Sequence, residues 1–302
     1  MDVLFIHHSV GENWLNAGLR QALLAKPYIR EVNDIYYGSD LPPDPGRPDS
    51  LQPLPGDFTD MDAWIFWFND YLGGLKQYQN PGGLARWMAP LERKVTARAP
   101  QMARYFNRLK ARPGTAGQNR IIMFKSCFPN SHLEPDGPPP GSPFSRERTI
   151  ANNQAIFQQV DDYTFQGTNY RALEQIFADN PDTLFIIITS PPLHYAPTDA
   201  TGDENARRAR QFNHWLKTDW LARYQAAHPG LNNVAVFDLF DLLAYPDTHP
   251  EHPNRLRADY GGETGDSHPN AAANAAATAA FAGTAGDGFI DRAWAAFAQT
   301  GK

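Results

Sequence analysis

Besides a hydrophobic core, the sequence offers few features that could stabilise the fold or attach the protein to a membrane. A single cysteine, Cys127, among 302 residues excludes an internal disulfide and a cysteine-rich zinc site. The longest apolar run, LFIIIT at 184–189, has the length of a strand and cannot cross a membrane. Lys and Arg form no run and the net charge is −6, which disfavours nucleic acid or an anionic membrane as a partner. With 42% hydrophobic residues, the composition indicates a globular protein with a substantial core.

The first residues leave the location of the protein open. DVLFI lacks the basic residues that begin a secretory signal and runs directly into a structural motif, so we expect no signal peptide here. A cytoplasmic protein and a periplasmic or secreted protein that has lost its leader are both compatible with this sequence.

Short apolar runs alternate with helical patterns along the whole chain. This alternation is typical of parallel βαβ units and predicts an α/β fold. Leu15, Leu19 and Leu23 recur at helical spacing. Strands are expected at 3–6, 31–38, 120–124, 184–189 and at the start of 232–243, and helices at 15–23, 92–112, 169–182, 204–227 and after 270. The linkers look like loops within one unit, so we expect a single domain over 1–302.

Two short motifs carry residues suited to acyl transfer. HHSVG, which begins at His7, follows the first strand directly, and Ser9 stands where a helix begins. DSHPN, near the other end of the chain, places His268 before an alanine-rich helix. A serine nucleophile needs an imidazole within hydrogen-bond reach, a carboxylate that orients this imidazole, and donors for the developing oxyanion. Ser9 and His268 are therefore the candidate nucleophile and base.

The order of these motifs resembles the SGNH/GDSL hydrolase superfamily, and in particular a divergent bacterial branch whose first block reads like FIHHS. The resemblance covers most of the chain. It implies a flavodoxin-like three-layer α/β/α fold with a central parallel sheet, and a Ser-His-Asp triad that needs no cofactor. By this resemblance Asp266 is the expected acid beside His268.

The sequence departs from the family's pattern at two places. The usual first block is Gly-Asp-Ser-Leu, and here it is His7-His8-Ser9-Val10. The acid usually precedes the histidine by three residues, but position 265 is glycine and Asp266 stands only two before His268. Asp266 could reach the imidazole through a changed turn, Glu263 could replace it, or a backbone carbonyl could hold the ring.

The resemblance also implies the donors of an oxyanion hole. The N–H of Ser9 lies at a helix start, and Gly38, at the end of the second strand, matches the family's glycine block by position. Asn130, in the loop after RIIMF, is the preferred asparagine. Asn69 is the alternative, because DAWIFWFND resembles a strand followed by Asn-Asp.

A catalytic metal is not expected. Adjacent strand residues point to opposite faces, so His7 and His8 should not converge on one ion with His268.

Taken together, these motifs predict a serine esterase that hydrolyses a carboxylic ester. The aromatic residues of the first half favour a glycan ester such as O-acetylated carbohydrate, although they can equally be core. Two alternatives remain: a glycan-binding or accessory module without catalysis, and an acyltransferase to a sugar.

Overall fold

A computed structural model of the chain describes residues 1–36, 60–80, 118–161, 163–283 and 287–299. Its centre is a five-stranded sheet in the order β2-β1-β3-β6-β7, and every neighbouring pair is parallel. The strands are β1 Asp2–His7, β2 Glu31–Tyr36, β3 Asn119–Lys125, β6 Leu184–Ile188 and β7 Val234–Phe237. The predicted α/β fold with a central parallel sheet is confirmed.

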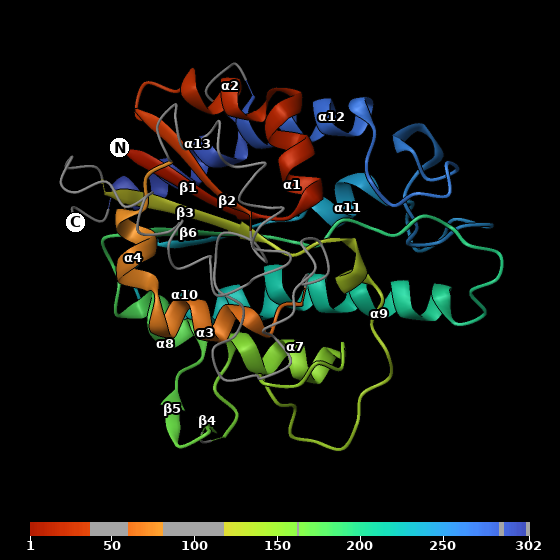
Figure 1. Ribbon diagram of the computed structural model, residues 1–302, viewed down its shortest axis with the longest axis horizontal. Coiled ribbons are helices and arrows are strands. Elements are labelled where there is room, and N and C mark those ends of the chain that lie inside the picture. The colour runs from red at the N-terminus through yellow and green to blue at the C-terminus, as the bar shows by residue number, and fades with distance from the viewer. Residues whose placement is uncertain (37–59, 81–117, 162, 284–286, 300–302) are drawn as a thin grey trace, which may run out of the picture.

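Helices cover both faces of this sheet, which gives three layers (Figure 1). One layer holds α1 Ser9–Trp14, α2 Arg20–Leu24, α12 Ala271–Ala282 and α13 Phe289–Ala298, with the wider turn η1 Leu15–Leu19 between the first two. The opposite layer holds α3 Ala63–Asp70, α4 Leu72–Gln77, α7 Ile150–Phe157, α8 Leu173–Ala178, α9 Gly202–Trp215 and α10 Leu221–Ala227, and η5 Leu216–Trp220 joins the last two. Shorter elements complete the described chain: η4 Phe128–Ser131, α11 Leu239–Leu243 and η6 Ala258–Tyr260.

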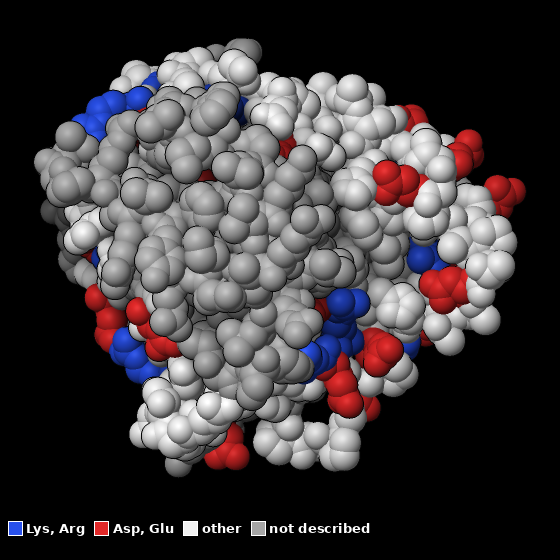
Figure 2. Space-filling view, in the orientation of Figure 1, with Lys and Arg blue, Asp and Glu red and all other residues white. Residues whose placement is uncertain are grey.

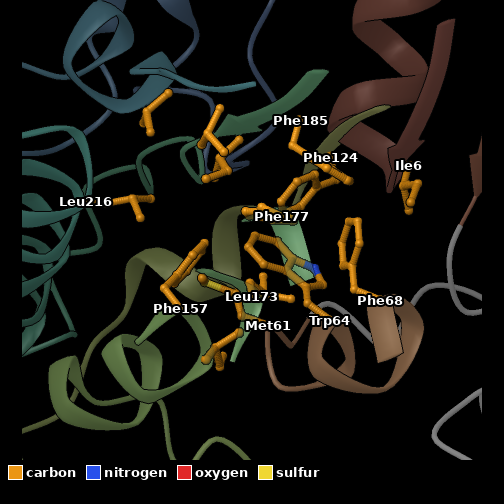
Figure 3. Packing of buried hydrophobic residues seen from close by; sticks show 14 of the residues in the cluster. Ile6, Met61, Trp64, Phe68, Phe124, Phe157, Leu173, Phe177, Phe185 and Leu216 are labelled. Atoms are coloured by element: carbon orange, nitrogen blue, oxygen red, sulfur yellow. The ribbon is translucent and has the colours of Figure 1, made fainter. Parts of the chain in front are cut away.

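The middle of each inner strand, β1, β3 and β6, is apolar because both of its faces are buried. In β1, Leu4 and Ile6 pack into the core on the α3 side, whereas Val3 and Phe5 pack into the core on the α1 side. All four side chains are fully buried. Phe124 of β3 lies in the first of these cores against Trp64 and Phe68 of α3, with ring centroids 4.9 and 4.8 Å apart (Figure 3).

The aromatic segment at 62–68, left without a firm assignment by its sequence, is the helix α3. Trp64, Trp67 and Phe68 face the sheet, and Ile65 and Phe66 pack on the other side against a small hairpin. This hairpin consists of β4 Tyr163–Phe165 and β5 Thr168–Tyr170. A helix that is buried on all sides shows no amphipathic period, so its sequence could not identify it as a helix.

The hairpin corrects one predicted boundary. The helix expected over 169–182 begins only at Leu173, because Asn169 and Tyr170 belong to β5. Gln166 and Gly167 both have positive φ, at 49° and 78°, and make the tight turn that joins the two strands. The predicted helix over 92–112 lies outside the described residues.

No helix in the described part of the chain is long and apolar enough to cross a membrane. On the face drawn in Figure 2, the described acidic and basic side chains are interspersed.

Candidate active site

Ser9 lies at the carboxyl end of β1, at the first position of α1. His8 adopts an extended conformation and serves as the N-cap residue, so the helix starts with no intervening loop. Gly11 makes this abrupt start possible, because a Cβ atom there would lie 2.3 Å from the Cβ of His7. The N–H groups of a helix's first turn have no acceptor within the helix, and the N–H of Ser9 is one of them.

The structure brings Ser9, His268 and Asp266 together, although 259 residues separate the first two in the chain. Ser9 Oγ lies 2.9 Å from His268 Nε2. On the other side of the ring, His268 Nδ1 lies 2.7 Å from Asp266 Oδ1. A carboxylate at Nδ1 fixes the proton there and leaves Nε2 as the acceptor for a serine hydroxyl. The hydrogen bond from His268 lowers the pKa of Asp266, which keeps the carboxylate ionised.

A compact turn explains how an acid only two residues before the histidine can reach it. Asp266 Oδ1 also accepts a hydrogen bond from the backbone N–H of His268, at 3.1 Å, so the carboxylate folds back over its own turn. Gly265 has φ +75°, a left-handed conformation that glycine adopts without strain. Glu263 is exposed, and within the described part of the chain the carboxylate bonded to His268 is that of Asp266.

A second imidazole also lies beside the nucleophile. His8 Nδ1 is 3.3 Å from Ser9 Oγ, compared with 2.9 Å for His268 Nε2. Burial lowers the pKa of His8 to about 4, and the positive charge of Lys125 adds to this effect. His8 is therefore neutral at physiological pH and a weak base, which leaves His268 as the stronger candidate for proton transfer.

His7 is directed away from the nucleophile, toward β2. Its Nε2 lies 3.4 Å from Asp34 Oδ2, and Arg20 donates to the other oxygen of Asp34 at 2.6 Å. Burial alone would raise the pKa of Asp34, but the hydrogen bond and charge of His7, together with Arg20, lower it well below its usual range. His7 therefore belongs to a cluster with Asp34 and Arg20, whereas His8 contacts Ser9.

The proposed oxyanion donors are only partly within the described structure. Gly38 lies outside the described residues. Asn130 is buried in η4, where its N–H donates to the carbonyl of Cys127, and Cys127 Sγ lies 3.6 Å from Ser9 Oγ. This turn thus reaches the nucleophile, and the donor role of Asn130 stays a prediction.

The alternative, Asn69, rested on a strand that the structure does not contain. Asn69 lies near the end of α3, and its side-chain amide donates to the carbonyls of Ile65 and Arg171 at 2.7 and 3.0 Å. Its Oδ1 accepts the N–H of Arg171. This amide joins a helix to the hairpin and has a structural role.

Sequence reasoning missed the contacts that surround His268. The Phe128 ring meets the His268 ring edge to face, with centroids 5.0 Å apart. Ser267, the neighbour of His268, is bonded through its hydroxyl to His194 Nδ1 at 2.8 Å. Phe128 follows β3 and His194 follows β6, so the rule that sites form at the carboxyl ends of parallel strands could have indicated both loops. Nothing in the sequence indicated which side chains would touch.

The described residues contain no group of three or more His, Cys, Asp or Glu side chains that could hold a metal ion. No protein-family model, curated protein or solved structure matches the chain.

Proposed function

We propose that this protein is a serine esterase and a divergent relative of the SGNH/GDSL hydrolases. The observation that carries the proposal is the continuous chain from Ser9 Oγ through His268 to Asp266, with contacts of 2.9 and 2.7 Å. This arrangement meets the three requirements of a nucleophile, a base and an orienting carboxylate.

In the proposed reaction, Ser9 Oγ attacks the ester carbonyl and its proton passes to His268 Nε2. The carbonyl oxygen gains negative charge, which the N–H of Ser9 and donors such as Asn130 and Gly38 stabilise. The ester C–O bond then breaks, and the leaving alcohol takes the proton from His268. Water attacks the acylated serine and gives its proton to His268, and the carboxylic acid leaves as Ser9 regains a proton. Asp266 stabilises the imidazolium in both halves of the cycle.

The geometry favours this reading over a binding module without catalysis. A serine that only capped its helix would not need a histidine from the far end of the chain directed at its hydroxyl. The side chains of His268 and Asp266 are 31% and 59% exposed. Access of water to this degree favours hydrolysis over transfer of the acyl group to a sugar.

Hydrolysis of p-nitrophenyl acetate and butyrate tests the proposal. We expect activity in the wild type and a loss of at least a thousandfold in Ser9→Ala and in His268→Ala. Ser145→Ala, a change at a half-buried serine in the loop before α7, is the matched control and should keep full activity. Equal rates in all four proteins, at the level of buffer, would overturn the proposal for these esters.

Covalent labelling gives an independent readout. Diethyl p-nitrophenyl phosphate should phosphorylate one serine, and mass spectrometry of the digested protein should place the added group on the peptide that contains Ser9. Labelling that persists in Ser9→Ala would assign the nucleophile to another residue.

A further inference from the structure

The cavity beside the candidate active site has walls that combine hydrogen-bonding and apolar groups. It has a volume of 280 Å³, and its lining includes Phe128, His132, His194, Asp199 and Arg255. Phe128 contacts the ring of His268, and His194 is bonded to Ser267. Two of the lining residues, Phe128 and His194, therefore contact the loop that carries the proposed base, His268.

Arg255 is the most unusual group in this lining. Its side chain is only 1% exposed, and its Nε donates to Asp203 Oδ1 at 3.0 Å. Its Nη2 has no hydrogen-bond partner in the described structure, and the carboxylate oxygen Asp199 Oδ2 lies 3.9 Å away. A buried guanidinium with five N–H donors normally uses more of them. Gly202 leaves room for this arrangement, since a Cβ there would lie 1.9 Å from Nη2.

His132 approaches the same carboxylate from another side and also falls short of it. Its Nε2 accepts a hydrogen bond from Asn205 Nδ2 at 2.7 Å, so in the neutral ring Nδ1 carries the proton. That Nδ1 lies 3.8 Å from Asp199 Oδ2. Asp199 is thus an acceptor with two donors just beyond hydrogen-bond distance, and such gaps are wide enough to be bridged through an inserted oxygen.

A hydroxyl group fits these gaps better than an anion does. A hydroxyl can accept from Arg255 or His132 while it donates to Asp199. An anion would be repelled by Asp199, and the two arginines of the lining, Arg148 and Arg255, already have Asp60 and Asp203 as partners. The ring of Phe128 and the side chain of Leu193 add an apolar wall, which suits the C–H face of a sugar ring.

We propose that this cavity is a subsite for the alcohol half of the substrate, and that this half is a ring with several hydroxyl groups, as in a sugar ester. The assignment rests on the proposed esterase function. In that reaction His268 passes its proton to the leaving alcohol, so the alcohol lies beside His268, whose ring contacts Phe128 of the cavity lining. Its hydroxyl groups form hydrogen bonds with Asp199, Arg255 and His132.

The test keeps the acyl group constant and varies the alcohol. The substrates are the monoacetates of methyl xylopyranoside, methyl glucopyranoside and methyl galactopyranoside, and cyclohexyl acetate, a ring of similar size without hydroxyl groups. For at least one sugar ester we expect kcat/KM to exceed that of cyclohexyl acetate by about tenfold or more, as for one hydrogen bond to a charged group. Asp199→Asn should reduce this preference at least fivefold. Asp219→Asn, which removes a charge from the exposed side of a helix, should leave the preference unchanged.

The outcomes separate the subsite from the esterase. If the wild type hydrolyses the esters with no preference above threefold, or if Asp199→Asn keeps the full preference, the subsite is refuted and the esterase stands. If the wild type hydrolyses none of them, saturation-transfer NMR with the three methyl glycosides decides the subsite alone. Binding that Asp199→Asn abolishes supports the subsite, and absence of binding overturns it. Thermal unfolding of the variants controls for misfolding.

Discussion

The buried Lys125 gives the most direct test of the electrostatic environment of the candidate active site. It is the last residue of β3, its side chain is fully buried, and its ammonium group donates to the carbonyl of Ser126 at 2.6 Å. Among the described residues no carboxylate forms an ion pair with it. Burial lowers the pKa of Lys125 to about 8 from its usual 10.5, against the opposing influence of Cys127.

Because of this lowered pKa, the protonated form of Lys125 is less favoured in the folded protein than in the unfolded chain. Between pH 8 and 10.5 the unfolded chain binds more protons at this site, so the free energy of unfolding gains a contribution from Lys125 as the pH rises. The difference between the two pKa values corresponds to about 3 kcal/mol, and about 2 kcal/mol of it is recovered between pH 7 and 9.5. Lys125→Met removes the charge with little change of volume, so the variant should be at least as stable as the wild type at pH 7.

Urea unfolding at pH 7 and pH 9.5 measures this effect. The wild type should gain about 2 kcal/mol relative to Lys125→Met over this interval. Lys26→Met is the matched control, because Lys26 is also buried but its ammonium group donates to Asp291 at 2.6 Å. This variant removes the ion-pair partner of the Asp291 carboxylate, which should lower the free energy of unfolding by about 3 kcal/mol at pH 7. A difference between wild type and Lys125→Met that is the same at both pH values would refute the reasoning, since Lys125 would then not titrate near pH 8.

Three further changes test the site and the core. Asp266→Asn should lower kcat for p-nitrophenyl acetate by about a hundredfold or more, and a loss below threefold would show that His268 is held without this carboxylate. Gly265→Ala places a side chain at φ +75°; it should cost about 1 kcal/mol in thermal unfolding and also lower kcat, whereas an unchanged melting temperature would contradict the strain argument. Phe124→Ala should cost about 3 to 5 kcal/mol in urea unfolding, because its ring packs between Trp64 and Phe68, and a loss below 1 kcal/mol would contradict this packing.

The sheet could be predicted because its strands are buried on both faces. VLFI, IIMF and LFIII are continuous apolar runs, and such runs indicate the central strands of a parallel sheet without any knowledge of tertiary contacts. The errors occurred where the local pattern was silent. The start of α8 was displaced because Asn169 and Tyr170 owe their strand conformation to pairing with Tyr163 and Thr164, which only the folded hairpin provides.

The candidate site could be predicted to the extent that it follows from position along the chain. Ser9 follows a strand, and Asp266 lies so close to His268 in sequence that one turn can join them. The contacts of Cys127 with Ser9 and of Phe128 with His268 are different, because they depend on how β3 lies beside β1. Free cysteine is among the most buried residue types and commonly behaves as a small hydrophobic residue, and Cys127 is the single cysteine of this chain. It is buried, but it also borders the nucleophile.

The contact between Ser9 and His268 is finally a consequence of helix packing. Ser9 begins α1, and His268 stands just before α12, so the distance between them is set by how these two helices lie against each other. Trp14, at the end of α1, fixes that relation: its Nε1 donates to Thr278 Oγ1 at 2.9 Å, and its ring packs on Phe281 with centroids 5.5 Å apart. Both partners belong to α12. The core on this face therefore does more than stabilise the fold, because the same contacts that bury Trp14 hold the base within reach of the nucleophile.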